Sequence, residues 1–177
     1  MNAAHPNSSQ QETKRFPTVP VYSTNAALKF EESETRDNFP TIQVQAAKRI
    51  GNGNENGGYK YSWDTNKILI QLTRDELPVF TAVLLGLIHE IRYEYRGRDR
   101  NKSFAIFLDN RNSHNEAHYV MELQEKSKRK LVVPIPPADA FYVVNLCLRQ
   151  LRRSQTWMST GDLMIVLKAV VGRLHRK

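Results

Sequence analysis

The sequence has a single cysteine and no apolar run that could cross a membrane. With only Cys147 present, no disulfide can form within the chain, and its apolar neighbours Val144 and Leu148 place it in a predicted core. The longest apolar stretch, residues 79–88, falls short of the ~18 residues that a transmembrane helix needs. We therefore expect a protein that neither spans a membrane nor binds one, with this stretch as a buried helix face.

A signal peptide is also missing from the start of the sequence. Residues 1–15 are polar and lack an apolar core, so secretion is not expected. This segment has little arginine, with Arg15 alone, although an organelle transit peptide stays an open alternative. We expect a flexible N-terminal arm over residues 1–17 and a cytoplasmic protein, associated with the nucleoid if bacterial.

Recognisable enzyme motifs are absent too. The glycine-rich residues 51–58 are not followed by the Gly-Lys-Ser/Thr of a phosphate-binding loop, and we predict a loop there. His114 and His118 resemble a metal pair, but they run from a loop into a strand and lack the helix of a zinc protease motif. No Ser, His and Asp arrangement stands out. We predict no catalytic residues, no metal site, no cofactor and no enzymatic activity.

Positive charge, by contrast, is abundant and unevenly distributed. The formal net charge is +8, and residues 91–177 carry 17 of the 26 lysines and arginines but only 8 of the 18 acidic residues. Such asymmetry favours a polyanionic partner, because Lys and Arg release the counterions condensed on phosphates. The alternative interpretation is a basic surface that serves solubility alone.

A strand that runs directly into a helix occurs twice. Residues 67–72 form a predicted strand that leads into a helix capped by Thr73 and Glu76, in the pattern of a capping box. A shift of 63 residues aligns Leu72 with Ile135, where a second predicted strand leads into a helix opened by Pro136 and Pro137. The chain is thus predicted to repeat one ββββα unit.

The remaining elements follow from period-two alternation and from helical spacing of apolar residues. A strand is predicted over residues 20–31, in which Ala26, Leu28 and Phe30 share one face and Ala27, Lys29 and Glu31 share the other. The other predicted strands are residues 41–48, 59–63, 91–96, 104–108, 118–123 and 131–135. An amphipathic helix is predicted over residues 162–175, capped by Ser159 or Thr160.

Three segments in this order resemble the Whirly family. Residues 21–28, Val-Tyr-Ser-Thr-Asn-Ala-Ala-Leu, are similar to its first-strand motif Val-Tyr-Lys-Gly-Lys-Ala-Ala-Leu. Residues 60–64, Lys-Tyr-Ser-Trp-Asp, are similar to its Lys-Tyr-Asp-Trp-Glu. Residues 132–135, Val-Val-Pro-Ile, followed by Asp139, are similar to its Val-Val-Pro-Val and helix start. The family's superfamily includes kinetoplastid mitochondrial RNA-binding proteins and transcriptional coactivators that bind single-stranded DNA.

The resemblance implies an α+β fold in which the ββββα unit is duplicated, giving two antiparallel four-stranded sheets packed with helices. It implies a Whirly-like domain over residues 18–157. The C-terminal amphipathic helix, assigned to residues 158–177, rests on the apolar spacing alone and departs from the family's usual ending. It also implies a homo-oligomer, with a tetramer favoured and a dimer as the alternative, that binds single-stranded nucleic acid with little sequence preference. Ser23 and Asn25 replace both lysines of the first-strand motif, which leaves the role of that strand open.

Single-strand binders combine aromatic rings that stack on bases with cations that follow the backbone. The candidate aromatic residues are Tyr22, Tyr61, Trp63, Tyr93 and Tyr95. Core packing is an equal alternative for Trp63, whereas we expect Tyr93 and Tyr95 to share the sheet surface. The candidate polar and cationic residues are Asn25, Lys29, Lys60, Arg92, Arg96, Arg98, Arg100, Lys102, Lys126, Lys128, Arg129 and Lys130.

Three hypotheses follow. The leading one is a nonspecific single-stranded DNA-binding protein for replication, repair, recombination or DNA transfer. The second is a protein that binds single-stranded or guide RNA and promotes annealing. The third is a structural scaffold that kept the fold without its nucleic-acid surface. Residues 126–130, which form a predicted basic hairpin turn, fit either phosphate contact or simple edge protection.

Overall fold

The computed structural model describes residues 17–52, 59–109 and 118–171. Residues 1–16 of the predicted arm, most of the glycine-rich loop, His114 and the end of the last predicted helix lie outside these ranges. Within them, no helix is long and apolar enough to cross a membrane.

The first sheet contains five strands in four positions. They are β1 (Thr18–Tyr22), β2 (Ala26–Glu34), β3 (Pro40–Asn52), β4 (Tyr59–Tyr61) and β5 (Ile68–Gln71). The long β3 pairs with β2 on one side, while β5 and then β4 follow one another along its other side. The sheet is therefore four strands wide, and its fourth position is divided between β4 and β5.

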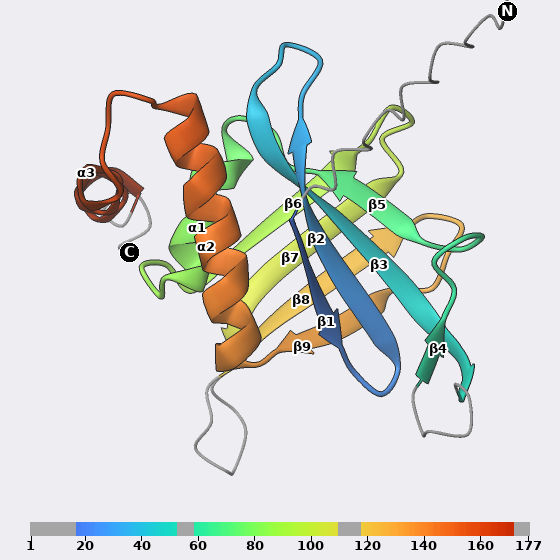
Figure 1. The fold of residues 1–177 in the computed structure, drawn as a ribbon. Helices are drawn as coiled ribbons and strands as arrows, with labels where there is room; N and C mark the ends of the chain where they lie inside the picture. Colours follow the sequence, from blue (N-terminus) through green and yellow to red (C-terminus); the bar gives the residue numbers. More distant parts are fainter. Residues whose placement is uncertain (1–16, 53–58, 110–117, 172–177) are drawn as a thin grey trace, which may run out of the picture.

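The predicted single strand over residues 20–31 is wrong, because the chain folds there into the β1–β2 hairpin (Figure 1). Ser23 closes the turn, since its backbone N–H donates to the carbonyl of Ala26 at 3.0 Å and its hydroxyl donates to the same oxygen at 2.7 Å. The Ser-Thr-Asn sequence of residues 23–25 is a local turn signal of the kind in which side chains replace ladder hydrogen bonds.

The second sheet is a simple meander, and each sheet is followed by a helix. Its strands are β6 (Glu90–Arg96), β7 (Lys102–Asp109), β8 (His118–Glu125) and β9 (Leu131–Ile135), in that spatial order and all antiparallel. The helices are α1 (Glu76–Leu84) after β5 and α2 (Pro137–Ser154) after β9. The predicted duplication of a ββββα unit in an α+β fold is confirmed.

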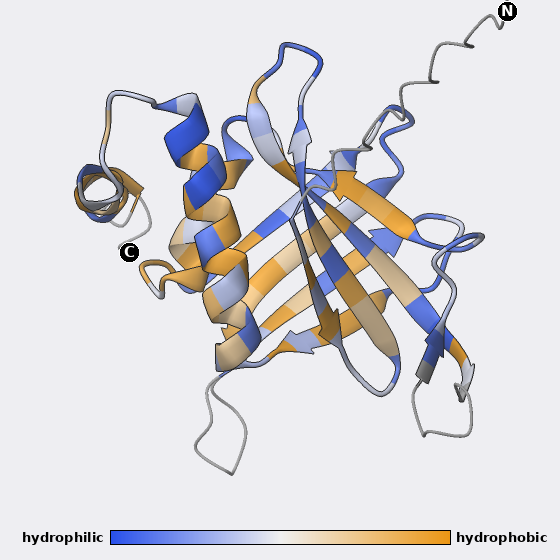
Figure 2. Ribbon diagram, viewed as in Figure 1, coloured by the Kyte–Doolittle hydropathy of each residue, from blue (hydrophilic) through white to orange (hydrophobic). Residues whose placement is uncertain are grey.

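One continuous core joins both units. β9 packs beside β2 and β3, and α1 and α2 pack against each other beside the two sheets (Figure 1). Phe30 of β2 and Phe80 of α1 are fully buried with ring centroids 6.3 Å apart, and Met121 and Val133 of the second sheet belong to the same cluster. Hydrophobic and hydrophilic residues alternate along the strands (Figure 2), as a sheet with one covered face requires.

The predicted capping box opens α1. The backbone N–H of Thr73 donates to Glu76 Oε2 at 2.8 Å, and the Glu76 N–H donates to the Thr73 hydroxyl at 3.3 Å. The helix ends at Leu84, and Gly86 follows with a φ of +68°. The buried helix face predicted over residues 79–88 therefore extends too far, although the Ile88 side chain is buried beyond the helix end.

The C-terminal segment folds as α3 (Thr160–Val166) and then a π-helical turn, η1 (Leu167–Val171). Ser159 caps it: its hydroxyl accepts from the Asp162 N–H at 3.1 Å, and its own N–H donates to Asp162 Oδ2 at 3.0 Å. Hydrogen bonds from Ser159 to the carboxylate lower the pKa of Asp162 below its usual value. The predicted cap at Ser159 is thus present, and the helix begins at Thr160, two residues before the predicted start.

Candidate nucleic-acid interface

Three of the predicted aromatic residues form one group on the outer face of the first sheet. The ring of Tyr61 lies 5.6 Å from that of Tyr22 and 6.3 Å from that of Trp63, measured between centroids. These rings cover Ala27 and Ala47, which are fully buried and belong to a cluster separate from the main core. We call Tyr22, Tyr61 and Trp63 the aromatic cluster.

The three rings differ in how much surface they offer. Tyr22 is 60% exposed, Tyr61 only 9%, and Trp63 is half-buried. Tyr61 is held in place because its hydroxyl donates to the Ser23 carbonyl at 2.7 Å. Tyr22 and Trp63 are therefore the rings with surface available to a ligand, and Tyr61 supports them.

Polar and cationic candidates surround the aromatic cluster. Lys60 is exposed on β4, next to Tyr61, and Asn25 is exposed in the β1–β2 turn. Lys29 lies on β2 and forms an ion pair of 2.6 Å with Glu31. The structure thus brings together the candidates from the first half of the chain.

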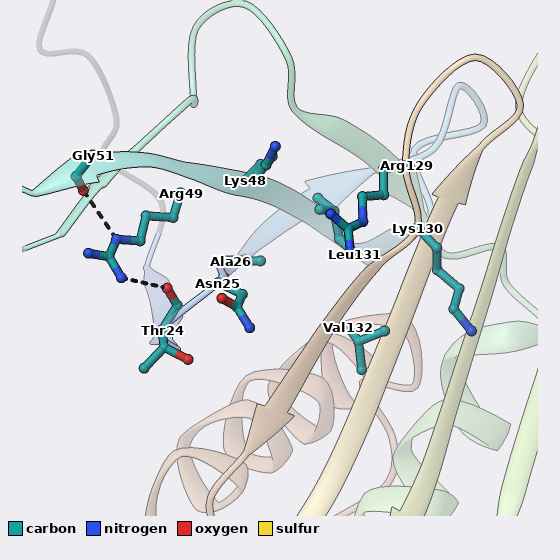
Figure 3. Close-up of a pocket in the computed structure, with 10 residues that line it drawn as sticks. All are labelled: Thr24, Asn25, Ala26, Lys48, Arg49, Gly51, Arg129, Lys130, Leu131 and Val132. Carbon is teal, nitrogen blue, oxygen red and sulfur yellow. Dashed lines mark hydrogen bonds between the residues drawn. The ribbon is translucent and has the colours of Figure 1, made fainter.

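A cleft of about 410 Å³ separates the two sheets where the β1–β2 turn and the end of β3 meet the start of β9 (Figure 3). Its cationic lining residues are Lys48, Arg49, Arg129 and Lys130. No acidic side chain occurs among the described residues that line it. This space, which we call the intersheet cleft, is accordingly suited to an anion.

Each cation of the intersheet cleft is positioned differently. Arg49 donates to the carbonyl oxygens of Thr24 at 3.1 Å and Gly51 at 3.3 Å, which directs it across the β1–β2 turn (Figure 3). Lys48 projects from the opposite side of β3, as alternation along a strand requires. Within the described ranges, Arg129 and Lys48 form no ion pair, whereas Lys130 lies 3.1 Å from Glu122.

The two tyrosines of β6 do not share a face. Tyr93 packs against Phe104 with centroids 5.2 Å apart and is half-buried, whereas Tyr95 is 67% exposed. Burial, and to a lesser degree the Glu76 carboxylate, raises the pKa of Tyr93. A register shift in the pairing with β7 lies between Tyr93 and Arg96 and interrupts the alternation on which the prediction of a common surface relied.

Several predicted phosphate contacts are occupied within the protein. Arg96 lies 2.6 Å from the buried carboxylate of Glu76. Lys102 donates to the Leu69 carbonyl at 3.0 Å, and Lys128 donates to the Lys67 carbonyl, also at 3.0 Å. These contacts connect the second ββββα unit to the first, so we assign the three cations to the fold.

Arg92 is also engaged, at the outer face of the second sheet. Its guanidinium lies 3.4 Å from both Glu90 and Glu122 and 5.6 Å from the ring centroid of Phe107. The remaining cationic candidates, Arg98, Arg100 and Lys126, are exposed in the β6–β7 and β8–β9 turns.

Lys48 and Arg49 were not predicted from the sequence as nucleic-acid-binding residues. Lys48 ends the predicted strand and Arg49 follows it, whereas β3 continues to Asn52. Both residues line the cleft because the β1–β2 turn and the start of β9 lie beside them. The adjacent pair of cations was the only local signal. In the described ranges, no three His, Cys, Asp or Glu side chains are grouped to hold a metal ion.

No family model and no curated protein matches the sequence. Solved structures do match. WHY1 from Arabidopsis thaliana superimposes with a TM-score of 0.55 at 14% identity, covering 89% of this chain and 93% of the other. WHY3 from the same plant gives 0.54 at 14%, covering 89% and 98%. The plant transcriptional regulator PBF-2 gives 0.54 at 15%, covering 93% and 98%. The chain therefore has the Whirly fold that its three short motifs predicted.

Proposed function

We propose that this protein binds single-stranded DNA with little sequence specificity. The observation that carries the proposal is that the aromatic cluster adjoins the intersheet cleft through a single turn. Tyr22 ends β1 on one side of this turn, and Thr24 and Asn25 line the cleft on the other. An unpaired strand can then place bases on the rings while its phosphates enter the cleft.

The aromatic cluster supplies the base contacts. Stacking of a base on an aromatic ring contributes about 1–3 kcal/mol, and it tolerates any sequence because every base has a π-face. Tyr22 is exposed and its ring packs against that of Tyr61, so it can stack on a base without a rearrangement of the sheet. Low specificity follows from this mode of contact.

The intersheet cleft supplies the phosphate contacts. Arg129 and Lys48 have no carboxylate partner among the described residues, so an incoming phosphate does not compete with an internal ion pair. Binding through such contacts weakens as salt rises, because counterions released from the strand must be replaced. Asn25, which lines the cleft from the β1–β2 turn, extends this surface toward the aromatic cluster.

The shared fold supports a nucleic-acid role, since one of the matched structures is that of a transcriptional regulator. Within this proposal, the protein acts without enzymatic activity in DNA replication, repair, recombination or transfer. It works as a homo-oligomer, with a tetramer favoured and a dimer as the alternative, in the cytoplasm or on the nucleoid.

A fluorescence-anisotropy titration tests the proposal. The full chain is mixed with a labelled single-stranded DNA of ~30 nucleotides at low salt, where electrostatic attraction is strongest. Saturable binding is expected. Tighter binding of an RNA of the same sequence would assign the protein to RNA, because contacts with the 2′-hydroxyl distinguish the two. Absence of binding to both DNA and RNA would favour the third hypothesis, a structural scaffold that does not bind nucleic acid.

A further inference from the structure

The end of β6 contains a β-bulge with a tyrosine in an unusual backbone conformation. Tyr93 pairs with Phe104 and Arg96 pairs with Lys102, so Glu94 and Tyr95 both lie opposite one residue of β7. Tyr95 has a φ of +57°, which is uncommon for a residue with a bulky side chain. Bulges redirect side chains, and here the result is a ring that is 67% exposed.

A second unusual conformation adjoins the first. The described residues include three non-glycine residues with positive φ, and two of them, Tyr95 and Arg100, line the same hollow of about 220 Å³. Lys126 enters the hollow from the β8–β9 turn. Strained backbone persists only where the surrounding structure enforces it, and it concentrates at ligand sites.

We propose that this hollow is a second nucleotide subsite, in which the Tyr95 ring stacks on an unpaired base and Arg100 and Lys126 contact its flanking phosphates. The proposal rests on the proposed function, because the ligand is the same unpaired strand. Arg100 and Lys126 are exposed and have no ion pair among the described residues. The site thus combines a stacking ring with two available cations, and its lining includes one acidic residue, Glu94.

The β8–β9 turn connects this subsite to the intersheet cleft. Lys126 lines the hollow, and Arg129 lines the cleft. Their Cα atoms are separated by three peptide units and so lie no more than ~11 Å apart. One strand can therefore follow the basic turn from the cleft to Tyr95, provided that it is long enough to occupy both.

A series of single-stranded DNA lengths tests this path with the full-length protein. Tyr95→Gly removes the ring and also suits the positive φ, since glycine adopts this conformation without strain. We expect this variant to bind long oligonucleotides roughly 5- to 150-fold more weakly than the wild type does, the equivalent of one lost stack. Its affinity for the shortest oligonucleotide that the wild type binds should stay unchanged. Tyr95→Phe should retain wild-type affinity at all lengths.

Tyr142→Ala is the matched control, because Tyr142 is a similarly exposed tyrosine on α2. Unchanged affinity of Tyr95→Gly for long strands, or equal loss at every length, would overturn the second subsite. If the wild-type protein binds strands and Tyr95→Gly binds them equally well, only this subsite fails. If the wild-type protein binds no strand of any length, the proposed function fails and the subsite fails with it.

Discussion

The hydroxyl of Tyr61 donates a 2.7 Å hydrogen bond to the carbonyl of Ser23, and this bond fastens β4 to the β1–β2 turn. The turn carries Tyr22 on one side and Asn25 on the other. The position of this turn therefore determines where the exposed ring of Tyr22 lies relative to the intersheet cleft. A contact between residues far apart in sequence determines whether one strand can reach both.

Tyr61→Phe tests the structural part of this relationship. It keeps the ring and removes the bond to Ser23, so we expect the free energy of unfolding to fall by about 0.5–1.5 kcal/mol. Urea denaturation of both proteins measures the difference. Tyr142→Phe serves as the control because Tyr142 is 60% exposed. An unchanged unfolding free energy in Tyr61→Phe would show that the bond does not stabilise the turn.

Tyr22→Ala tests the stacking surface. Because Tyr22 is exposed, we expect little change in unfolding free energy, while affinity for single-stranded DNA should fall by about 1–3 kcal/mol for a lost stack. Tyr22→Phe should bind as the wild type does, since it keeps the ring. Anisotropy titration provides the affinities. Equal affinity of the alanine variant and the wild type would exclude Tyr22 from the interface.

The intersheet cleft is tested by the double variant Lys48→Gln, Arg129→Gln. Each phosphate contact contributes about 0.7 to the slope of log affinity against log salt for single strands, so the slope should flatten by about 1.4. Arg36→Gln is the control, because Arg36 is exposed in the β2–β3 turn, beyond the other end of β2. A slope as steep as that of the wild type would place the phosphates elsewhere.

The sequence predicted the strands and helices well where each had its own local pattern. The capping box at Thr73 and Glu76 and the cap at Ser159 depend on residues three positions apart, and both are present. The β1–β2 hairpin was missed because Ala26, Leu28 and Phe30 alternate correctly and hide the turn before them. The Ser-Thr-Asn sequence of residues 23–25 was the local signal for the turn, and the alternation on its C-terminal side outweighed it.

Site residues were less predictable for the same reason. The aromatic cluster follows from strand alternation, which places Tyr61 and Trp63 on one side, but its separation from the core depends on Ala27 and Ala47. The bulge that separates Tyr93 from Tyr95 arises from the register with β7 and has no local signature. Lys102 and Arg96 were predicted as cations available to phosphates, because their partners, the Leu69 carbonyl and the Glu76 carboxylate, come from distant parts of the chain.

Glu76→Ala tests the connection between the two units. Glu76 is 4% exposed, caps α1 and pairs with Arg96 at 2.6 Å. Loss of one partner from a buried pair destabilises by about 3–5 kcal/mol, and we expect a decrease of this size in the free energy of unfolding. Asp75→Ala alters the exposed neighbour and should change stability little. Equal effects of the two substitutions would contradict a structural role for the pair.

Burial of Cys147 makes the free energy of unfolding depend on pH in the alkaline range. Burial raises the pKa of this thiol to about 12 from 9.0. Below pH 9 the thiol is protonated in both states, and its contribution to stability is fully present. Above pH 9 the unfolded chain loses the proton first, so stability should fall by about 1.4 kcal/mol per pH unit until the folded pKa is reached.

Denaturation of wild type and Cys147→Ala at several alkaline pH values isolates this effect, because other titrating groups contribute equally to both proteins. The variant should lack the additional decline, although it starts from a lower stability because the substitution leaves a cavity. Parallel curves would show that the thiol is not shielded in the folded protein.

Competition between single-stranded and duplex DNA of the same sequence, at one low salt concentration, tests the central claim most directly. A duplex presents the same phosphates but keeps its base faces stacked, so it cannot use the aromatic cluster. We predict that unlabelled single strand displaces a labelled single strand at far lower concentration than duplex does, and that Tyr22→Ala narrows this difference. Equal displacement by the two forms would mean that charge alone binds DNA, and would contradict the account.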